Sequence, residues 1–101
     1  MEFINVGNST AVAAGTLKAF DVEGTRVAVA NVGGSFYAFS DICTHMHCSL
    51  AKGKLEGTVV TCACNGSQFD VTTGAVRRGP AREPVRAFQV RIKGDSVQVE
   101  A

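Results

Sequence analysis

The chain has 101 residues, of which 46% are hydrophobic, and its ten Lys and Arg residues nearly balance nine Asp and Glu residues. This length predicts one domain with a core of its own. The near-neutral charge argues against nucleic-acid binding, which needs a clear basic excess, and no apolar run is long enough for a membrane-spanning helix.

Residues 1–40 are expected to form a meander of short antiparallel strands. The predicted strands span residues 3–6, 17–22, 27–30 and 36–39. Gly7 ends the first strand, and residues 8–15 are expected to be a loop, because their apolar part is too short to stand as a helix. Glu23-Gly24 and Gly33-Gly34 mark the tight turns that connect the later strands.

Residues 41–84 differ in composition from the rest, because they contain every Cys, His and Pro residue of the chain. Two strand-like segments, 58–61 and 68–71, lie next to glycine-containing turns and are expected to hold two loops in a small sheet. This stretch is therefore predicted to be a ligand-bearing subdomain inserted into a β base of residues 1–40 and 85–101.

The C-terminal part again predicts β structure. Phe88, Val90 and Ile92 alternate with polar residues, a pattern typical of a half-buried strand. Gly94 lies in the following turn, after which residues 97–99 continue the alternation. The fold class is predicted to be all-β, with both ends of a single domain, residues 1–101, forming one small antiparallel sandwich or barrel.

Both histidines and all four cysteines lie in two short segments. Residues 43–48 read Cys-Thr-His-Met-His-Cys, and residues 62–69 read Cys-Ala-Cys-Asn-Gly-Ser-Gln-Phe. Soft sulfur and borderline nitrogen donors gathered this closely indicate a site for iron or zinc. The N-terminus lacks the features of a signal peptide, so the protein is expected to be cytoplasmic. In that reducing compartment cysteines more often serve as metal ligands or redox groups than as a disulfide framework.

The spacing in these segments resembles the ligand loops of the Rieske [2Fe–2S] proteins, Cys-x-His followed by Cys-x-x-His. The resemblance implies that Cys43 and Cys62 bind one iron as thiolates and that His45 binds the other iron as an imidazole. The fourth ligand of the family pattern, a histidine, falls on Asn65. The amide of asparagine is neutral, weakly basic and a poor ligand for iron.

The resemblance also assigns the remaining two cysteines. Cys48 and Cys64 match the residues that form a disulfide between the two loops in many Rieske proteins. The four cysteines would then divide into two ligands and one cross-link. Burial beside a cluster would protect such a bridge in a reducing compartment.

Residues around the ligands resemble the family as well. Gly66 would let the backbone approach the cluster closely. Ser67 matches a hydroxyl that hydrogen-bonds a bridging sulfide and raises the reduction potential. Phe69 stands where high-potential members often carry tyrosine, and Pro80 belongs to a loop that covers the cluster from a third side.

Asn65 leaves three hypotheses open for the site. In the first, the chain is a ligand-substituted Rieske protein with an altered or missing cluster. In the second, His47 swings in as a replacement imidazole. In the third, a single iron or zinc ion takes the place of the cluster, held by Cys43, His45 and Cys62, with His47 or water completing a tetrahedral site.

The resemblance implies a Rieske-type antiparallel β-sandwich base with a cluster-binding subdomain, and a function as a one-electron carrier of the soluble Rieske ferredoxin type. The expected partners are a flavin-dependent reductase and a terminal oxygenase, and no residue is predicted to be catalytic. One alternative is the small subunit of a cytoplasmic reductase of the nitrite reductase type. Another is a module stapled by one structural metal, for which a zinc set is available: Cys43, His45, Cys62 and Cys64.

Four arginines follow the second cysteine segment: Arg77, Arg78, Arg82 and Arg86. They are expected to form a solvated loop face. A docking patch for an acidic partner is the alternative interpretation.

Overall fold

Ten strands and two short 3-10 helices form the regular structure of the computed structural model, which describes residues 2–100. The strands lie in two antiparallel sheets, so the expected all-β fold class is confirmed. The predicted base also includes residues 1 and 101, which lie outside the described range. Within residues 2–100, no helix has the length and apolar character needed to cross a membrane.

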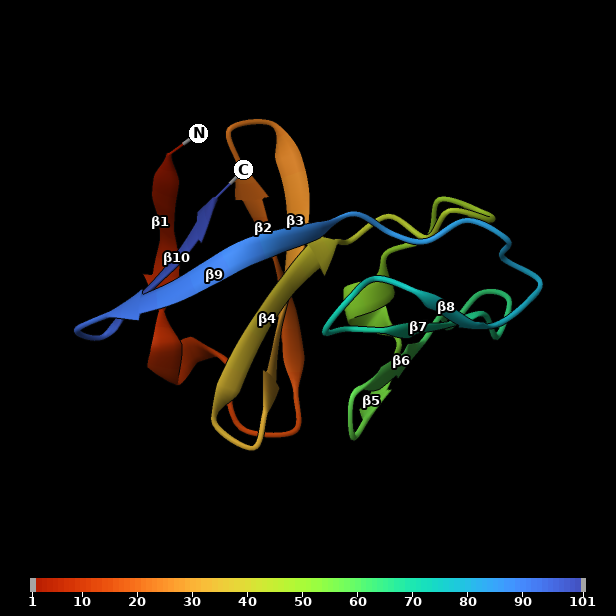
Figure 1. The fold of residues 1–101 in the computed structure, drawn as a ribbon, viewed down its shortest axis with the longest axis horizontal. Coiled ribbons are helices and arrows are strands. Elements are labelled where there is room, and N and C mark those ends of the chain that lie inside the picture. Colours follow the sequence, from red (N-terminus) through yellow and green to blue (C-terminus); the bar gives the residue numbers. More distant parts are fainter. Residues whose placement is uncertain (1, 101) are drawn as a thin grey trace.

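The larger sheet is built from both ends of the chain (Figure 1). Its strands are β1 (Phe3–Asn8), β2 (Leu17–Val22), β3 (Thr25–Val32), β4 (Ser35–Ser40), β9 (Ala87–Lys93) and β10 (Ser96–Glu100). They are arranged in the order β1-β10-β9-β4-β3-β2. The two outer strands approach each other, since Gly7 of β1 lies against the ring of Phe20 in β2. The sheet therefore curls around its own core and forms the base.

The smaller sheet comes from the segment between β4 and β9 and lies beside the base (Figure 1). Its strands are β5 (Lys54–Glu56), β6 (Val59–Thr61), β7 (Gln68–Asp70) and β8 (Val76–Arg78), in that order across the sheet. The 3-10 helix η2 (Leu50–Lys52) precedes β5. Both cysteine segments adjoin this sheet.

Strand β3 is buried on both faces and contributes to two hydrophobic cores. Val27 and Val29 point into the base, where they pack with residues such as Phe88. Ala28 and Ala30 lie on the opposite face and pack against residues of the smaller sheet. Small alanine side chains let the smaller sheet approach β3 closely, and the larger valines fill the base.

The N-terminal region departs from the sequence-based expectation in two places. Strand β1 continues past Gly7 to Asn8, because a bulge between Asn5 and Gly7 lets pairing with β10 resume. The predicted loop 8–15 begins with a 3-10 helix, η1 (Ser9–Ala11). The Asn8 side chain caps this turn by accepting a hydrogen bond from the Thr10 N–H at 2.9 Å, a local contact that apolar periodicity does not reveal.

Three further elements were not predicted: η2, β5 and β8. Arg77 and Arg78 lie on β8, so the expectation of a loop at these two residues was wrong. Three-residue strands carry too few side chains to show an alternating pattern, and they form because a neighbouring strand offers a pairing edge. The alternation in β9 also ends early, since Ile92 is exposed.

Candidate metal centre

The two cysteine segments form loops with the same backbone frame. In the first loop the Cys43 N–H donates to the Cys48 carbonyl at 2.9 Å, and the His47 N–H donates to the Cys43 carbonyl at 2.9 Å. In the second loop Cys62 donates to the Ser67 carbonyl at 2.8 Å and receives a bond from the Gly66 N–H at 3.0 Å. Each loop therefore turns its chain back within five residues and points its first cysteine inward.

His47 and Gly66 occupy equivalent positions in these two frames, four residues after the first cysteine. Their φ angles are +57° and +77°, in the left-handed region. Glycine adopts this conformation without strain, and histidine is one of the residues that tolerate it. Gly66 is thus explained by its backbone angle. A role in letting the backbone approach a cluster stays a prediction, because nothing lies within 4 Å of its missing Cβ position.

Asp41 anchors the first loop to the base, although the sequence analysis did not single it out. Its side chain is fully buried and accepts hydrogen bonds from the Ser49 hydroxyl at 2.6 Å and the Ala51 N–H at 2.8 Å. It also pairs with Arg26 of β3, with 3.1 Å between Nη2 and Oδ2. One signal for this role is present in the sequence: an aspartate just before the first cysteine segment, followed beyond that segment by hydroxyl and backbone groups that can donate to it.

Cys43 and Cys62 are free, buried cysteines, and each thiol influences the pKa of the other. Burial raises the pKa of Cys43, but hydrogen bonds from the His45 N–H and the Asn65 amide help to bring it below its ordinary value. Burial, together with the neighbouring Cys43, holds the pKa of Cys62 above its ordinary value despite hydrogen bonds from the N–H groups of Cys64 and Asn65. The pair therefore offers two sulfur donors facing the same space.

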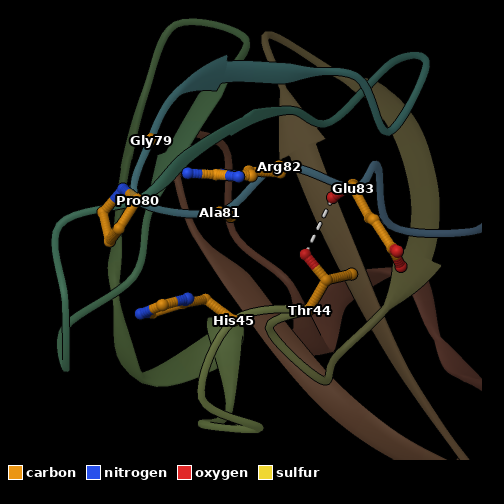
Figure 2. Close-up of a pocket in the computed structure, with 7 residues that line it drawn as sticks. All are labelled: Thr44, His45, Gly79, Pro80, Ala81, Arg82 and Glu83. Atoms are coloured by element: carbon orange, nitrogen blue, oxygen red, sulfur yellow. Dashed lines mark hydrogen bonds between the residues drawn. The ribbon is translucent and has the colours of Figure 1, made fainter.

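His45 lies at the surface and lines a cavity between the first loop and the proline loop, residues 79–83 (Figure 2). The cavity has a volume of about 600 Å³. Its lining residues are Thr44, His45, Gly79, Pro80, Ala81, Arg82 and Glu83. The Thr44 hydroxyl donates to the Glu83 carbonyl at 2.8 Å, which holds the proline loop next to the first loop. The imidazole of His45 is thus accessible from outside the protein.

A disulfide joins Cys48 of the first loop to Cys64 of the second. Cys64 is exposed and Cys48 is half-buried. The sulfur atoms of this pair and of Cys62 lie within 4.8 Å of one another. While the bridge is intact, Cys48 and Cys64 are not thiolates and bind no metal.

Asn65 places its side-chain amide against the cysteine pair. Its Nδ2 donates to the Cys43 sulfur at 3.6 Å, and its Oδ1 accepts a hydrogen bond from the Ser67 N–H at 2.9 Å. An amide nitrogen has hydrogens and no available lone pair, so the group facing the sulfur is a donor and not a ligand. Two thiols and one imidazole match the donors of a mixed-ligand cluster, but position 65 does not supply the second nitrogen.

Ser67 connects the second loop to the proline loop. Its hydroxyl is buried and accepts a hydrogen bond from the Ala81 N–H at 2.9 Å, next to Pro80. Phe69 is fully buried in β7, where it pairs with Val60 of β6. Ser67 therefore fixes the second loop to the proline loop, and Phe69 fixes β7 in the core.

Comparison with known proteins places this geometry in a family. The profile of the Rieske [2Fe-2S] domain matches residues 2–89. The ferredoxin component of biphenyl 2,3-dioxygenase from Rhodococcus jostii (strain RHA1) is 36% identical over 100 residues, which cover 99% of this chain and 94% of that protein.

Two solved structures are similar over nearly the whole chain. The ferredoxin of carbazole 1,9a-dioxygenase from Nocardioides aromaticivorans IC177 has a TM-score of 0.93 and 33% identity, covering 98% of this chain and 97% of that one. A chain in the complex of reduced oxygenase and oxidized ferredoxin in carbazole 1,9a-dioxygenase has a TM-score of 0.91 and 35% identity, covering 96% and 91%. The predicted family is thus confirmed: the chain belongs to the Rieske [2Fe–2S] domain family.

Proposed function

We propose that this protein is a one-electron carrier of the Rieske ferredoxin type, which accepts electrons from a flavin-dependent reductase and passes them to a terminal oxygenase. The observation that carries the proposal is the buried thiol pair Cys43 and Cys62 beside the accessible imidazole of His45, held in the fold of oxygenase ferredoxins. The similar ferredoxin in complex with its oxygenase supports the choice of partner.

Within this proposal, Cys43 and Cys62 bind one iron of a [2Fe–2S] cluster and His45 binds the other. A bound cluster would supply reversible one-electron chemistry. The protein contributes hydrogen bonds from backbone N–H groups to both cysteine sulfurs, which favour the thiolate forms that bind metal. Ser67 holds the loop of Pro80 by accepting the Ala81 N–H, and Asn65 leaves one ligand position without a nitrogen donor.

Electron exchange with partners is proposed to occur at the end of the molecule that carries His45. Met46, next to it, is 57% exposed and could contact a partner there. Residues 41–84 would act as the cluster-binding subdomain of one domain, and the protein would be a cytoplasmic carrier without catalytic residues of its own.

A redox titration of anaerobically prepared protein tests the proposal. A reversible one-electron couple, with the electron paramagnetic resonance signal of a mixed-ligand cluster after reduction, is the expected result. Absence of any reversible couple in folded protein that contains iron would overturn the carrier function. Electron transfer from a flavin-dependent reductase to an oxygenase of the relatives' class, measured with and without the protein, then tests the partners.

The position of Asn65 favours a second candidate, a single iron or zinc ion held by Cys43, His45 and Cys62. Iron, zinc and sulfide analysis separates it from the first. Two irons and two sulfides per chain would exclude the single ion, and one metal without sulfide would exclude an intact cluster. The variant His47→Ala tests the replacement imidazole, since an unchanged spectrum would exclude His47 as a ligand.

A further inference from the structure

A free thiol lies next to the disulfide that joins the two loops. The sulfur of Cys62 lies within 4.8 Å of both sulfurs of the Cys48–Cys64 bridge. A sulfur–sulfur bond is about 2 Å long, so a gap of less than about 3 Å separates Cys62 from a bond with either partner. Turning a cysteine side chain from one staggered position to the next moves its sulfur by about 3 Å. Movement of the required size is therefore available without unfolding the loops.

A thiol and a disulfide at this distance can exchange partners. In such a reaction a thiolate attacks one sulfur of the bridge, and the other sulfur leaves as a thiolate. Cys62 would release its proton to solvent and form a bond with Cys48, while the bond between Cys48 and Cys64 breaks. Cys64 would then take up a proton from solvent. The numbers of thiols and disulfides stay the same, so the step needs no oxidant or reductant.

The surroundings of the bridge favour Cys64 as the leaving sulfur. Cys64 is exposed and Cys48 is half-buried, and a charged sulfur is more stable in water than in apolar surroundings. A bridge between Cys62 and Cys64 would also have to close over the single residue Ala63. The backbone there is already fixed by the hydrogen bond from the Cys62 N–H to the Ser67 carbonyl at 2.8 Å. A bond between Cys48 and Cys62 instead keeps the two loops joined.

We infer that in the metal-free protein Cys62 exchanges into the bridge, forming a Cys48–Cys62 disulfide and releasing Cys64 as an exposed thiol. The exchange removes Cys62 from the donors available to a metal. Conversely, the exchange cannot start while the Cys62 sulfur is bound to a metal. The protein would thus present a surface thiol only when its metal site is empty. This consequence rests on the proposed ligand role of Cys62, whereas the exchange itself does not.

Thiol labelling of the folded protein, freed of metal and reductant, tests the exchange. Cys43 and Cys62 are 0% and 1% exposed, so a maleimide in solution should react with neither. The expected product carries the label on Cys64 and has Cys48 bonded to Cys62. It should accumulate over minutes to hours, the usual time for uncatalysed disulfide rearrangement. Digestion at acidic pH stops further exchange, and fragment spectra distinguish Cys62 from Cys64 within one peptide.

Three results of this labelling would overturn the inference. The first is a Cys48–Cys64 bridge that stays intact, with no label on Cys64, after overnight incubation. The second is label on Cys62 beside an intact bridge, which would show that Cys62 becomes exposed without exchanging. The third is label on Cys48, which would show that the attack falls on the Cys64 sulfur.

Two variants identify the attacking sulfur. Cys62→Ala removes it and should abolish the labelling of Cys64. Cys43→Ala is the matched control, because it removes the other buried free thiol and should leave the rate of Cys64 labelling unchanged. Circular dichroism shows that each variant is folded before it is labelled. Labelling that persists in Cys62→Ala, or that is lost only in Cys43→Ala, would contradict the assignment of Cys62.

These experiments are independent of the test of the carrier function. They use protein without metal, so their result does not depend on whether a bound cluster gives a reversible couple. A failed redox titration would leave the exchange standing. A bridge that never exchanges would in turn leave the carrier function standing.

Discussion

The side-chain amide of Asn65 donates a hydrogen bond to the sulfur of Cys43, with 3.6 Å between Nδ2 and Sγ. This contact connects the second loop to the first at the place where the family pattern has its fourth ligand. Asn65→His should therefore raise the iron and sulfide content after reconstitution toward two of each per chain, because it supplies the missing nitrogen. Asn65→Ala is the control, since it removes the amide without adding a ligand. Equal cluster content in both variants would show that position 65 does not ligate.

Variants at His47 test whether the two loops share the same backbone conformation. Because its φ of +57° matches the position of Gly66, His47→Gly should keep or raise the free energy of unfolding, by up to about 1 kcal/mol. His47→Val should lower it by about 1–2 kcal/mol, since a β-branched residue is strained in this conformation. Denaturant unfolding measures both. A lower stability for His47→Gly than for His47→Val would contradict the role assigned to the backbone angle.

Gly74 lies against Val85, at the point where the chain returns from the proline loop to the base. Its φ is +83°, its carbonyl accepts the Val85 N–H at 2.9 Å, and an added Cβ would overlap the Val85 carbonyl oxygen. Gly74→Ala should lower the free energy of unfolding by about 2–4 kcal/mol, combining conformational strain with backbone displacement. Gly57→Ala is the matched control, with a φ of +60° and open space around the added carbon. Its cost should be about 1–2 kcal/mol, and similar losses in both would argue against the overlap.

The buried carboxylate of Asp41 should matter more than its ion pair. Asp41→Ala leaves the Ser49 hydroxyl and Ala51 N–H without their acceptor and should cost about 2–4 kcal/mol of stability. Arg26→Gln should cost only about 1 kcal/mol, because the Arg26 side chain is 52% exposed and the other hydrogen bonds remain. Chemical denaturation at neutral pH gives both values. The reverse ranking would mean that the ion pair, and not the loop contacts, fixes Asp41.

The carboxyl group of Asp70 should make the free energy of unfolding depend on pH. Hydrogen bonds from the Thr72 hydroxyl at 2.6 Å and N–H at 2.8 Å outweigh burial and, with nearby Arg77, hold the Asp70 pKa below its ordinary value. A lowered pKa in the folded state means that the stabilisation is complete above the unfolded pKa of about 3.9 and is lost as the pH falls through the folded value. The stability difference between the unaltered protein and Asp70→Asn should therefore be largest near neutrality and shrink below about pH 4. A difference that is constant from pH 7 to pH 3 would contradict this assignment.

The family and the main strands were predictable because their signals are local. The spacing of Cys43, His45 and Cys62 is written directly in the sequence, and the alternation of Phe88 and Val90 with polar residues in β9 needs only neighbouring residues. The short strand β8 was missed because it exists only through pairing with β7. The paired residues, Gln68 with Arg78 and Phe69 with Val76, are close in the chain, but periodicity does not reveal the pairing. Asp41 was missed because its partners are a β3 arginine and groups beyond the first loop, and only the folded structure brings them together.

The candidate site, like the fold, was predictable only in part. Ligand types follow from residue identity, whereas the partner of the Asn65 amide and the equivalence of His47 with Gly66 depend on three-dimensional positions. An amide at position 65 reads from sequence as a missing ligand. In the structure it is also a hydrogen-bond donor to a sulfur, which changes the chemistry that the loops can support.

Because β3 is buried on both faces, the exchange of its backbone amide hydrogens depends on the base and on the metal-binding loops together. Val27 and Val29 belong to one core and Ala28 and Ala30 to the other, so separating either sheet from β3 exposes a strand that both need. The hydrogens of β3 should consequently exchange with solvent only through the largest opening of the molecule. A metal ion that binds the folded loops would slow this exchange in β3 by mass action, so the β3 amides would report on metal loading of the loops.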